Sequence, residues 1–132
     1  MTEINISELS VGDWISDKNG IVAQVRGIEC WSDGYVVNVR TKAGTITSLT
    51  VEGVRPIPLL PKILEKNGFE ELKDKSWVGH NHHCHIQQHR SSCTLLANKR
   101  GFYRTIRFEG LAFVHELQHA LRLAGVEKEI EV

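Results

Sequence analysis

Asp33-Gly34-Tyr35-Val36-Val37-Asn38-Val39-Arg40 is the stretch that decides the fold of the first half of this chain. Asp-Gly is a favoured two-residue turn between antiparallel strands. The residues after the turn alternate, so that Tyr35, Val37 and Val39 share one face of an extended chain. The stretch therefore predicts a hairpin whose second strand is buried on one side.

Two further tight turns flank this hairpin. Asn19-Gly20 and Ala43-Gly44 also separate apolar runs that favour strands. The predicted strands cover residues 13–16, 21–28, 35–40 and 45–51. Short antiparallel strands at this spacing form a meander. We expect residues 1–57 to fold as an SH3-like antiparallel meander or barrel.

Prolines then punctuate the chain and mark a link. Pro56 and Pro58 favour an extended course, and a helix is expected to begin at or just after Pro61. Asn67-Gly68 is a typical stop signal for such a short helix. Residues 58–75 are therefore predicted to be a helical link.

Residues 76–132 predict a second antiparallel sheet followed by an amphipathic helix. The expected strands are 77–88 (as one strand or two), 93–97 and 102–108. Glu109-Gly110 is expected to end the last strand, and a helix at about 111–124 is expected to close at Gly125. The predicted fold class is a single α+β domain made of 1–57, 58–75 and 76–132.

Composition limits the classes of function. Sixteen basic and sixteen acidic residues cancel, so no whole-chain charge attracts nucleic acid or acidic lipid. No apolar run approaches the ~20 residues that a membrane span needs, and three cysteines are an odd number for a disulfide framework. We expect a protein of the bacterial cytoplasm with no membrane partner.

His115-Glu116-Leu117-Gln118-His119 has the spacing of a zinc-hydrolase motif. In that hypothesis His115 and His119 bind zinc, Glu116 is the catalytic base, and His83 or His85 of the histidine-rich segment supplies a third ligand. The third ligand would come from upstream, whereas familiar enzymes with this motif take it from downstream.

Helix geometry favours a different role for these histidines. At 100° per residue the apolar side chains of this helix gather on one arc of roughly 120°. They are Phe113, Val114, Leu117, Ala120, Leu121 and Ala124. The arc should face the sheet, which leaves His115 and His119 pointing to solvent alongside Gln118 and Arg122. We therefore expect no cofactor, with zinc as the alternative.

Two phrases carry a resemblance to a known family. They are Glu-Gly-Val-Arg-Pro-Ile-Pro-Leu at 52–59, which runs on to Ile-Leu-Glu-Lys-Asn-Gly-Phe at 63–69, and Val-His-Glu-Leu-Gln-His-Ala-Leu-Arg-Leu at 114–123. With the Gly12-Asp13-Trp14 opening, the chain resembles a family of small uncharacterised proteins from gut Bacteroidetes and from their phages and prophages. The resemblance implies an origin and a topology, and it attaches no activity.

The leading hypothesis is a non-enzymatic binding or interaction protein of phage or prophage origin. In one version Arg100, Arg104 and Arg107 hold the phosphate oxygens of a small nucleotide, which an oligomer of this chain sequesters. The partner is otherwise a host or phage protein.

Nucleic acid is an alternative partner. The basic residues of 99–107 alternate with aromatic ones. Trp31 and Tyr35 are candidate ligand-binding aromatics, unless Tyr35 belongs to the core and Trp31 covers one end of the barrel.

Overall fold

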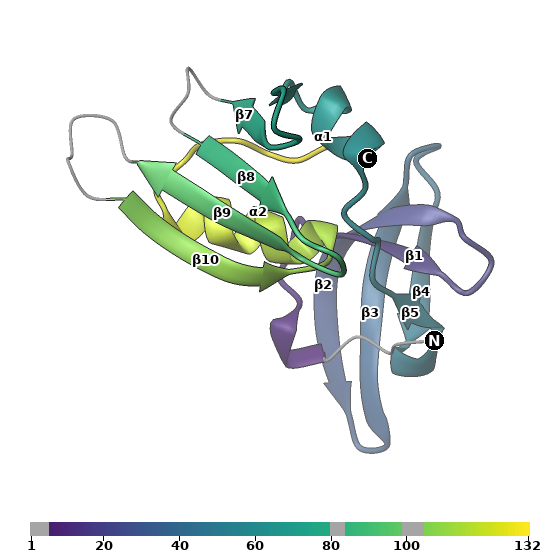
Figure 1. Cartoon of the computed structure of the whole chain (residues 1–132). Coiled ribbons are helices and arrows are strands. Elements are labelled where there is room, and N and C mark those ends of the chain that lie inside the picture. The colour runs from purple at the N-terminus through teal and green to yellow at the C-terminus, as the bar shows by residue number, and fades with distance from the viewer. Residues whose placement is uncertain (1–5, 80–83, 99–104) are drawn as a thin grey trace. The chain divides into compact units, whose positions relative to one another are not determined.

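The structure is a computed structural model that describes residues 6–79, 84–98 and 105–132. The chain forms two compact units, Met1–Ile57 (unit 1) and Pro58–Val132 (unit 2), and each is described by itself (Figure 1). Each unit contains one five-stranded antiparallel sheet, and unit 2 adds two α-helices, so the fold is of mixed α and β type. Within the described ranges, no helix is long and apolar enough to cross a membrane.

Unit 1 is a meander with short 3₁₀ turns before and after its main strands. Its elements are η1 (Ile6–Glu8), β1 (Trp14–Asp17), β2 (Val22–Trp31), β3 (Gly34–Thr41), β4 (Ile46–Thr50), η2 (Val51–Gly53) and β5 (Val54–Arg55). The strand order in the sheet is β4-β3-β2-β1-β5. The four strands predicted from the turn sequences are confirmed, with bounds that differ by up to three residues.

Local turn chemistry explains why these hairpins form. The carboxylate of Asp17 accepts the backbone N–H groups of Asn19 (2.8 Å) and Ile21 (2.9 Å), which closes the first turn. Gly20 has φ +84°, a left-handed conformation that glycine adopts without a steric penalty. This turn therefore fixes the register between β1 and β2.

One face of the unit 1 sheet carries the apolar core. Its members alternate along the strands and are nearly all inaccessible: Leu9, Ile15, Ala23, Val25, Val37, Val39 and Val54, with Ile6 and Leu49 packed against them. The sheet stays open, because β4 and β5 are its two edges and the described residues show no pairing between them. The closed barrel expected for residues 1–57 is therefore not formed. β5 has only two residues and pairs with β1 alone.

Unit 2 is a second meander with a helix at each end. Its elements are α1 (Pro61–Lys66), β6 (Glu70–Glu71), β7 (Trp77–Gly79), β8 (Cys84–Gln88), β9 (Cys93–Asn98), β10 (Thr105–Leu111) and α2 (Val114–Leu123). The strand order is β10-β9-β8-β7-β6. The predicted helix after Pro61 is confirmed, with Pro61 in its first turn and Gly68 just beyond its end at φ +83°.

The last strand of unit 2 differs from the prediction. Glu109-Gly110 was expected to end it, but β10 continues to Leu111, which pairs with Cys93. The register shifts between Phe108 and Leu111, and Gly110 has φ +74°. Glycine therefore accommodates a bulge here and not a strand end, and α2 begins at Val114, about three residues later than predicted.

Helix α2 packs against β9 and β10 and lies behind them in Figure 1. Its side chains meet the apolar face of the sheet, where Ile86 and Leu95 are fully buried. Leu117 and Leu121 on the helix are also fully buried. Removing side chains of this size from water stabilises the unit by about 1.5–3 kcal/mol each.

A second contact in unit 2 joins Phe69, just before β6, to Gly79 at the end of β7, and its packing can be tested. A Cβ atom at position 79 would lie 2.7 Å from Cδ1 of Phe69 and 2.8 Å from Cε1. We expect Gly79→Ala to lower the free energy of unfolding by about 1–3 kcal/mol, measured by urea denaturation. The double variant Phe69→Leu/Gly79→Ala should lose less than the sum of the two single changes, because the smaller side chain removes the clash. Additive losses would contradict this packing.

Candidate functional site

The two histidines of the α2 motif lie in different environments. His115 is only 2% exposed, and His119 is half-buried. The expectation that both face solvent is therefore wrong for His115. Its ring stacks on Phe113 with the centroids 6.0 Å apart, and the ring of His119 meets it edge-on at 5.8 Å.

The buried side of α2 is wider than its apolar residues indicate. Gln118 is also buried, at 3% exposed, so the covered arc extends from Ala120 round to His115, roughly 220° at 100° per residue. The side-chain amide of Gln118 donates to the carbonyl of Lys128 (2.8 Å), and its oxygen accepts the N–H of Ile130 (2.6 Å). Residues 126–132 therefore cover the side of the helix that carries Gln118.

Glu116 has a structural role at the start of α2. One oxygen of its carboxylate accepts the backbone N–H groups of Ala112 (2.9 Å) and Phe113 (3.0 Å). Phe113 is the residue that caps α2, and a glutamate three residues after the cap commonly accepts the backbone N–H of the cap residue. The residue assigned as catalytic base is thus half of a capping box.

The described residues do not assemble the proposed zinc site. They contain no group of three or more His, Cys, Asp or Glu side chains that could hold a metal ion. His83 lies outside the described residues. His85 is half-buried in β8, where it pairs with Val78 and Leu96.

His85 lies close enough to Asp74 to influence the pKa of the Asp74 carboxyl. The pKa of the Asp74 carboxyl is lowered, chiefly because the hydroxyl and backbone N–H of Ser76 donate to it (2.5 and 3.1 Å). An electrostatic interaction with His85 lowers that pKa further. Two donors make at most part of a metal site, because structural zinc takes four ligands.

Trp31 and Tyr35 are both exposed, but they lie on opposite faces of the β2–β3 hairpin. Cys30 pairs with Tyr35 and Trp31 with Gly34, so the face of Tyr35 is also the face of the core residue Val37. Tyr35 is 43% exposed, which places it beyond the core, and Trp31 is 58% exposed. The two aromatics therefore form no common binding platform.

A polar network fixes Trp31 on its own face. Its indole N–H donates to Glu29 (3.1 Å), and the other oxygen of Glu29 accepts from Asn38 (3.1 Å). The oxygen of Asn38 in turn accepts from the hydroxyl of Ser48 (2.7 Å). The chain of bonds crosses β2, β3 and β4, so Trp31 is held by the sheet.

The arginines assigned to phosphate are only partly described. Arg107 lies on β10 and forms an exposed ion pair with Glu109 at 2.7 Å. Arg100 and Arg104 lie outside the described residues. A carboxylate so close to Arg107 competes with any phosphate for its guanidinium group.

Unit 2 contains a cavity of about 280 Å³ that sequence reasoning missed. One wall is apolar and consists of residues 58–61 with Leu111 and Ala112. The other wall is the β8–β9 turn, residues 88–93. The backbone N–H of Leu59 donates to the carbonyl of Ala112 (3.0 Å), which holds the first wall together.

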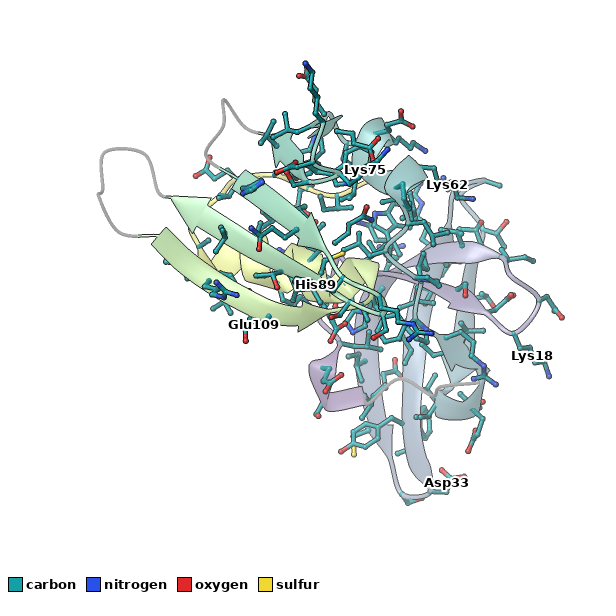
Figure 2. The ribbon with its side chains drawn as sticks, viewed as in Figure 1. Lys18, Asp33, Lys62, Lys75, His89 and Glu109 are labelled. Carbon is teal, nitrogen blue, oxygen red and sulfur yellow. The ribbon has the colours of Figure 1, made fainter. Side chains whose placement is uncertain are left out.

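The polar wall is built by hydrogen bonds within the turn. The N–H of His89 donates to the carbonyl of Ser92 (2.8 Å), and the ring Nε2 of His89 bonds the buried hydroxyl of Thr94 (2.9 Å). Figure 2 labels His89 at this turn, directly after β8. The imidazole is therefore positioned by the fold.

The lining of the cavity contains basic residues and no acidic ones. Arg90 and His89 line it together with the hydroxyls of Ser91 and Ser92. No ion pair joins Arg90 to another residue in the part of the chain that the structure describes. A guanidinium group and hydroxyl donors beside an apolar wall suit an anionic group on an apolar body. The Arg90-Ser91-Ser92 sequence, a cation in a serine turn between two strands, is the signal that could have pointed here.

Two of the three cysteines are protected by the sheet. Burial raises the pKa of the Cys84 thiol to about 11 and raises that of Cys93, which lines the cavity. Cys30 at the end of β2 is exposed. The thiolate is the reactive form, so burial lowers the reactivity of both thiols.

The capping role of Glu116 can be tested by stability. We expect Glu116→Ala to lower the free energy of unfolding by about 0.5–2 kcal/mol, because the backbone N–H groups of Ala112 and Phe113 lose their acceptor. The exposed carboxylate variant Glu109→Ala is the control and should change it by less than about 0.5 kcal/mol. Equal effects in urea denaturation would contradict the assignment.

Thiol reactivity provides a separate check on burial. A rise of two units in pKa lowers the thiolate fraction roughly 100-fold at pH 7. We expect one fast reaction per folded chain with a thiol reagent, from Cys30, and slow reaction of Cys84 until the chain unfolds. Cys30→Ser should abolish the fast phase, and its persistence would show that the sheet does not protect the other two thiols.

No family model, curated protein or solved structure matches this chain. The case for a function therefore rests on the geometry of the described residues. Of that geometry, the cavity of unit 2 has the clearest chemistry.

Proposed function

We propose that this protein is a non-enzymatic binding protein that holds a small anionic ligand in the cavity of unit 2. The cavity between the β8–β9 turn and residues 58–61 is the observation that carries the proposal. Ligand pockets commonly enclose about 300–1,000 Å³, so a cavity of about 280 Å³ suits a ligand at the small end of that range.

The chemistry of the two walls suggests the ligand class. Arg90 offers a planar pair of N–H donors for phosphate or carboxylate oxygens, and Ser91 and Ser92 add hydroxyl donors. Pro58 and Leu60 offer an apolar surface for a ring. A mononucleotide has both parts, so a small nucleotide is the ligand we favour, with Arg90 in the phosphate-binding role that the sequence predicted for Arg100, Arg104 and Arg107.

The sequence resemblance supports a setting for this activity. A small protein of that family is expected to act in the bacterial cytoplasm, where it would sequester a nucleotide. The meander order of unit 1, with the 3₁₀ turn η2 between β4 and β5, supports a relation to SH3-like folds. Fold alone implies no ligand, so unit 1 is assigned none.

Ligand binding by calorimetry tests the proposal. We expect adenosine monophosphate or a related mononucleotide to bind, and Arg90→Gln to weaken it about 10–100-fold, because a hydrogen bond to a charged group contributes about 1.5–3 kcal/mol. Arg107→Gln is the matched control and should leave affinity unchanged. The affinities of adenosine and of inorganic phosphate, measured separately, show how much of the binding comes from the apolar wall and how much from the polar wall.

Two outcomes would contradict the proposal. One is the failure of a panel of mononucleotides, sugar phosphates and small carboxylates to bind at millimolar concentration. The other is a binding anion whose affinity falls with Arg107→Gln and stays constant with Arg90→Gln. That result would move the site to β10.

A further inference from the structure

Gln88 connects the cavity of unit 2 to the core of the sheet. It is the last residue of β8, and it lines the cavity. Its side-chain oxygen accepts the indole N–H of Trp77 (3.1 Å), which is 3% exposed. Trp77 pairs with Ile86, two residues before Gln88 on the strand, so the two side chains lie on the same face of the sheet.

The indole determines which way the amide of Gln88 faces. A tryptophan N–H can only donate, and a buried donor needs an acceptor. A carboxamide has an acceptor oxygen and a donor NH₂ group on the same carbon. Turning the amide over would place its N–H groups against the indole N–H of Trp77, and the buried donor would lose its partner. The oxygen of Gln88 therefore stays with Trp77.

The amide thus offers its NH₂ group to a molecule in the cavity. In the part of the chain that the structure describes, the Nε2 atom of Gln88 has no hydrogen-bond partner. Arg90 offers N–H donors to the same cavity, and Ser91 and Ser92 offer hydroxyl donors. Because no lining residue is acidic, the side chains of the cavity mainly donate. They complement a ligand that carries acceptor oxygens on its ring as well as on its anionic group.

We propose that Gln88 is a specificity-determining residue of the cavity and selects a ligand with an oxo group, not an amino group, on its ring. The inference rests on the proposed binding of a small nucleotide. The N–H groups of Gln88 donate to the oxygen of an oxo-substituted base, whereas an amino-substituted base sets donor against donor and leaves polar groups unpaired. Trp77 is not among the lining residues, so it acts as a positioning residue through Gln88.

Two matched nucleotides test the selection. Inosine monophosphate and adenosine monophosphate share the sugar and the phosphate, and they carry an oxo and an amino group, respectively, at C6 of the base. We expect the wild-type protein to bind inosine monophosphate about tenfold more tightly in calorimetry, because only its oxo group accepts from Gln88.

Two glutamine variants assign the preference to one side chain. Gln88→Met removes the amide from an exposed position and should lower the affinity for inosine monophosphate about tenfold, without lowering that for adenosine monophosphate. Gln87→Met is the matched control. Gln87 is the preceding residue of β8, on the opposite face, and does not line the cavity. We expect this control to keep the wild-type preference.

A variant of Trp77 tests the positioning role. Trp77→Phe keeps an aromatic ring in the core but removes the indole N–H, so the amide of Gln88 can turn either side toward the ligand. We expect the preference for inosine monophosphate to disappear, with tighter binding of adenosine monophosphate than in the wild type. A loss of core packing alone would not raise that affinity. If Trp77→Phe does not fold, Gln88→Met still decides the proposal.

The outcomes separate this inference from the proposed function. Equal binding of the two nucleotides by the wild type, with both weakened by Arg90→Gln, would overturn the selection by Gln88 and leave the anion-binding function standing. A preference that survives Gln88→Met would also overturn it. If neither nucleotide binds at millimolar concentration, the nucleotide proposal and this inference fail together.

Discussion

Two buried carboxamides, those of Gln118 and Asn67, bond the backbone of residues 126–132, which pair with no strand in the described part of the chain. Buried N–H and C=O groups must be paired, and the bonds from Gln118 and Asn67 to residues 126–132 pair them. Asn67 also donates to the carbonyl of Ile63 (2.7 Å), so the same side chain ends α1. One set of contacts thereby joins both helices to the segment.

The sequence was informative wherever structure is decided locally. The hairpins of unit 1 and the end of α1 follow from residues within four positions of each other, such as Asp17 with Asn19 and Ile21. The orientation of α2 was not predictable in the same way. Its apolar arc was read correctly, but the partner of Gln118 is reached only after the chain reverses at Gly125. Gln118 is therefore buried although it is polar.

The candidate site shows the same limit. The zinc motif was visible because its residues are neighbours in sequence, yet Glu116 caps a helix and His115 is enclosed. The cavity was not visible, because its lining comes from three separate parts of the chain that folding brings together through the bond of Leu59 with Ala112 and the pairing of Leu111 with Cys93. The spacing of residues along the chain does not predict which distant segments come into contact when the chain folds. The basic character of the cavity, by contrast, is indicated by the Arg90-Ser91-Ser92 sequence.

The hydrogen bond between Trp77 and Gln88 gives the molecule an internal optical probe. The indole of Trp77 is 3% exposed and donates to the side-chain oxygen of Gln88 (3.1 Å), a residue that lines the cavity. Trp31 is largely exposed, and Trp14 lies beneath the ammonium of Lys42 at 6.0 Å. Blue-shifted emission therefore originates mainly from Trp77, and a change in its intensity would report events at the β8–β9 turn without any added dye.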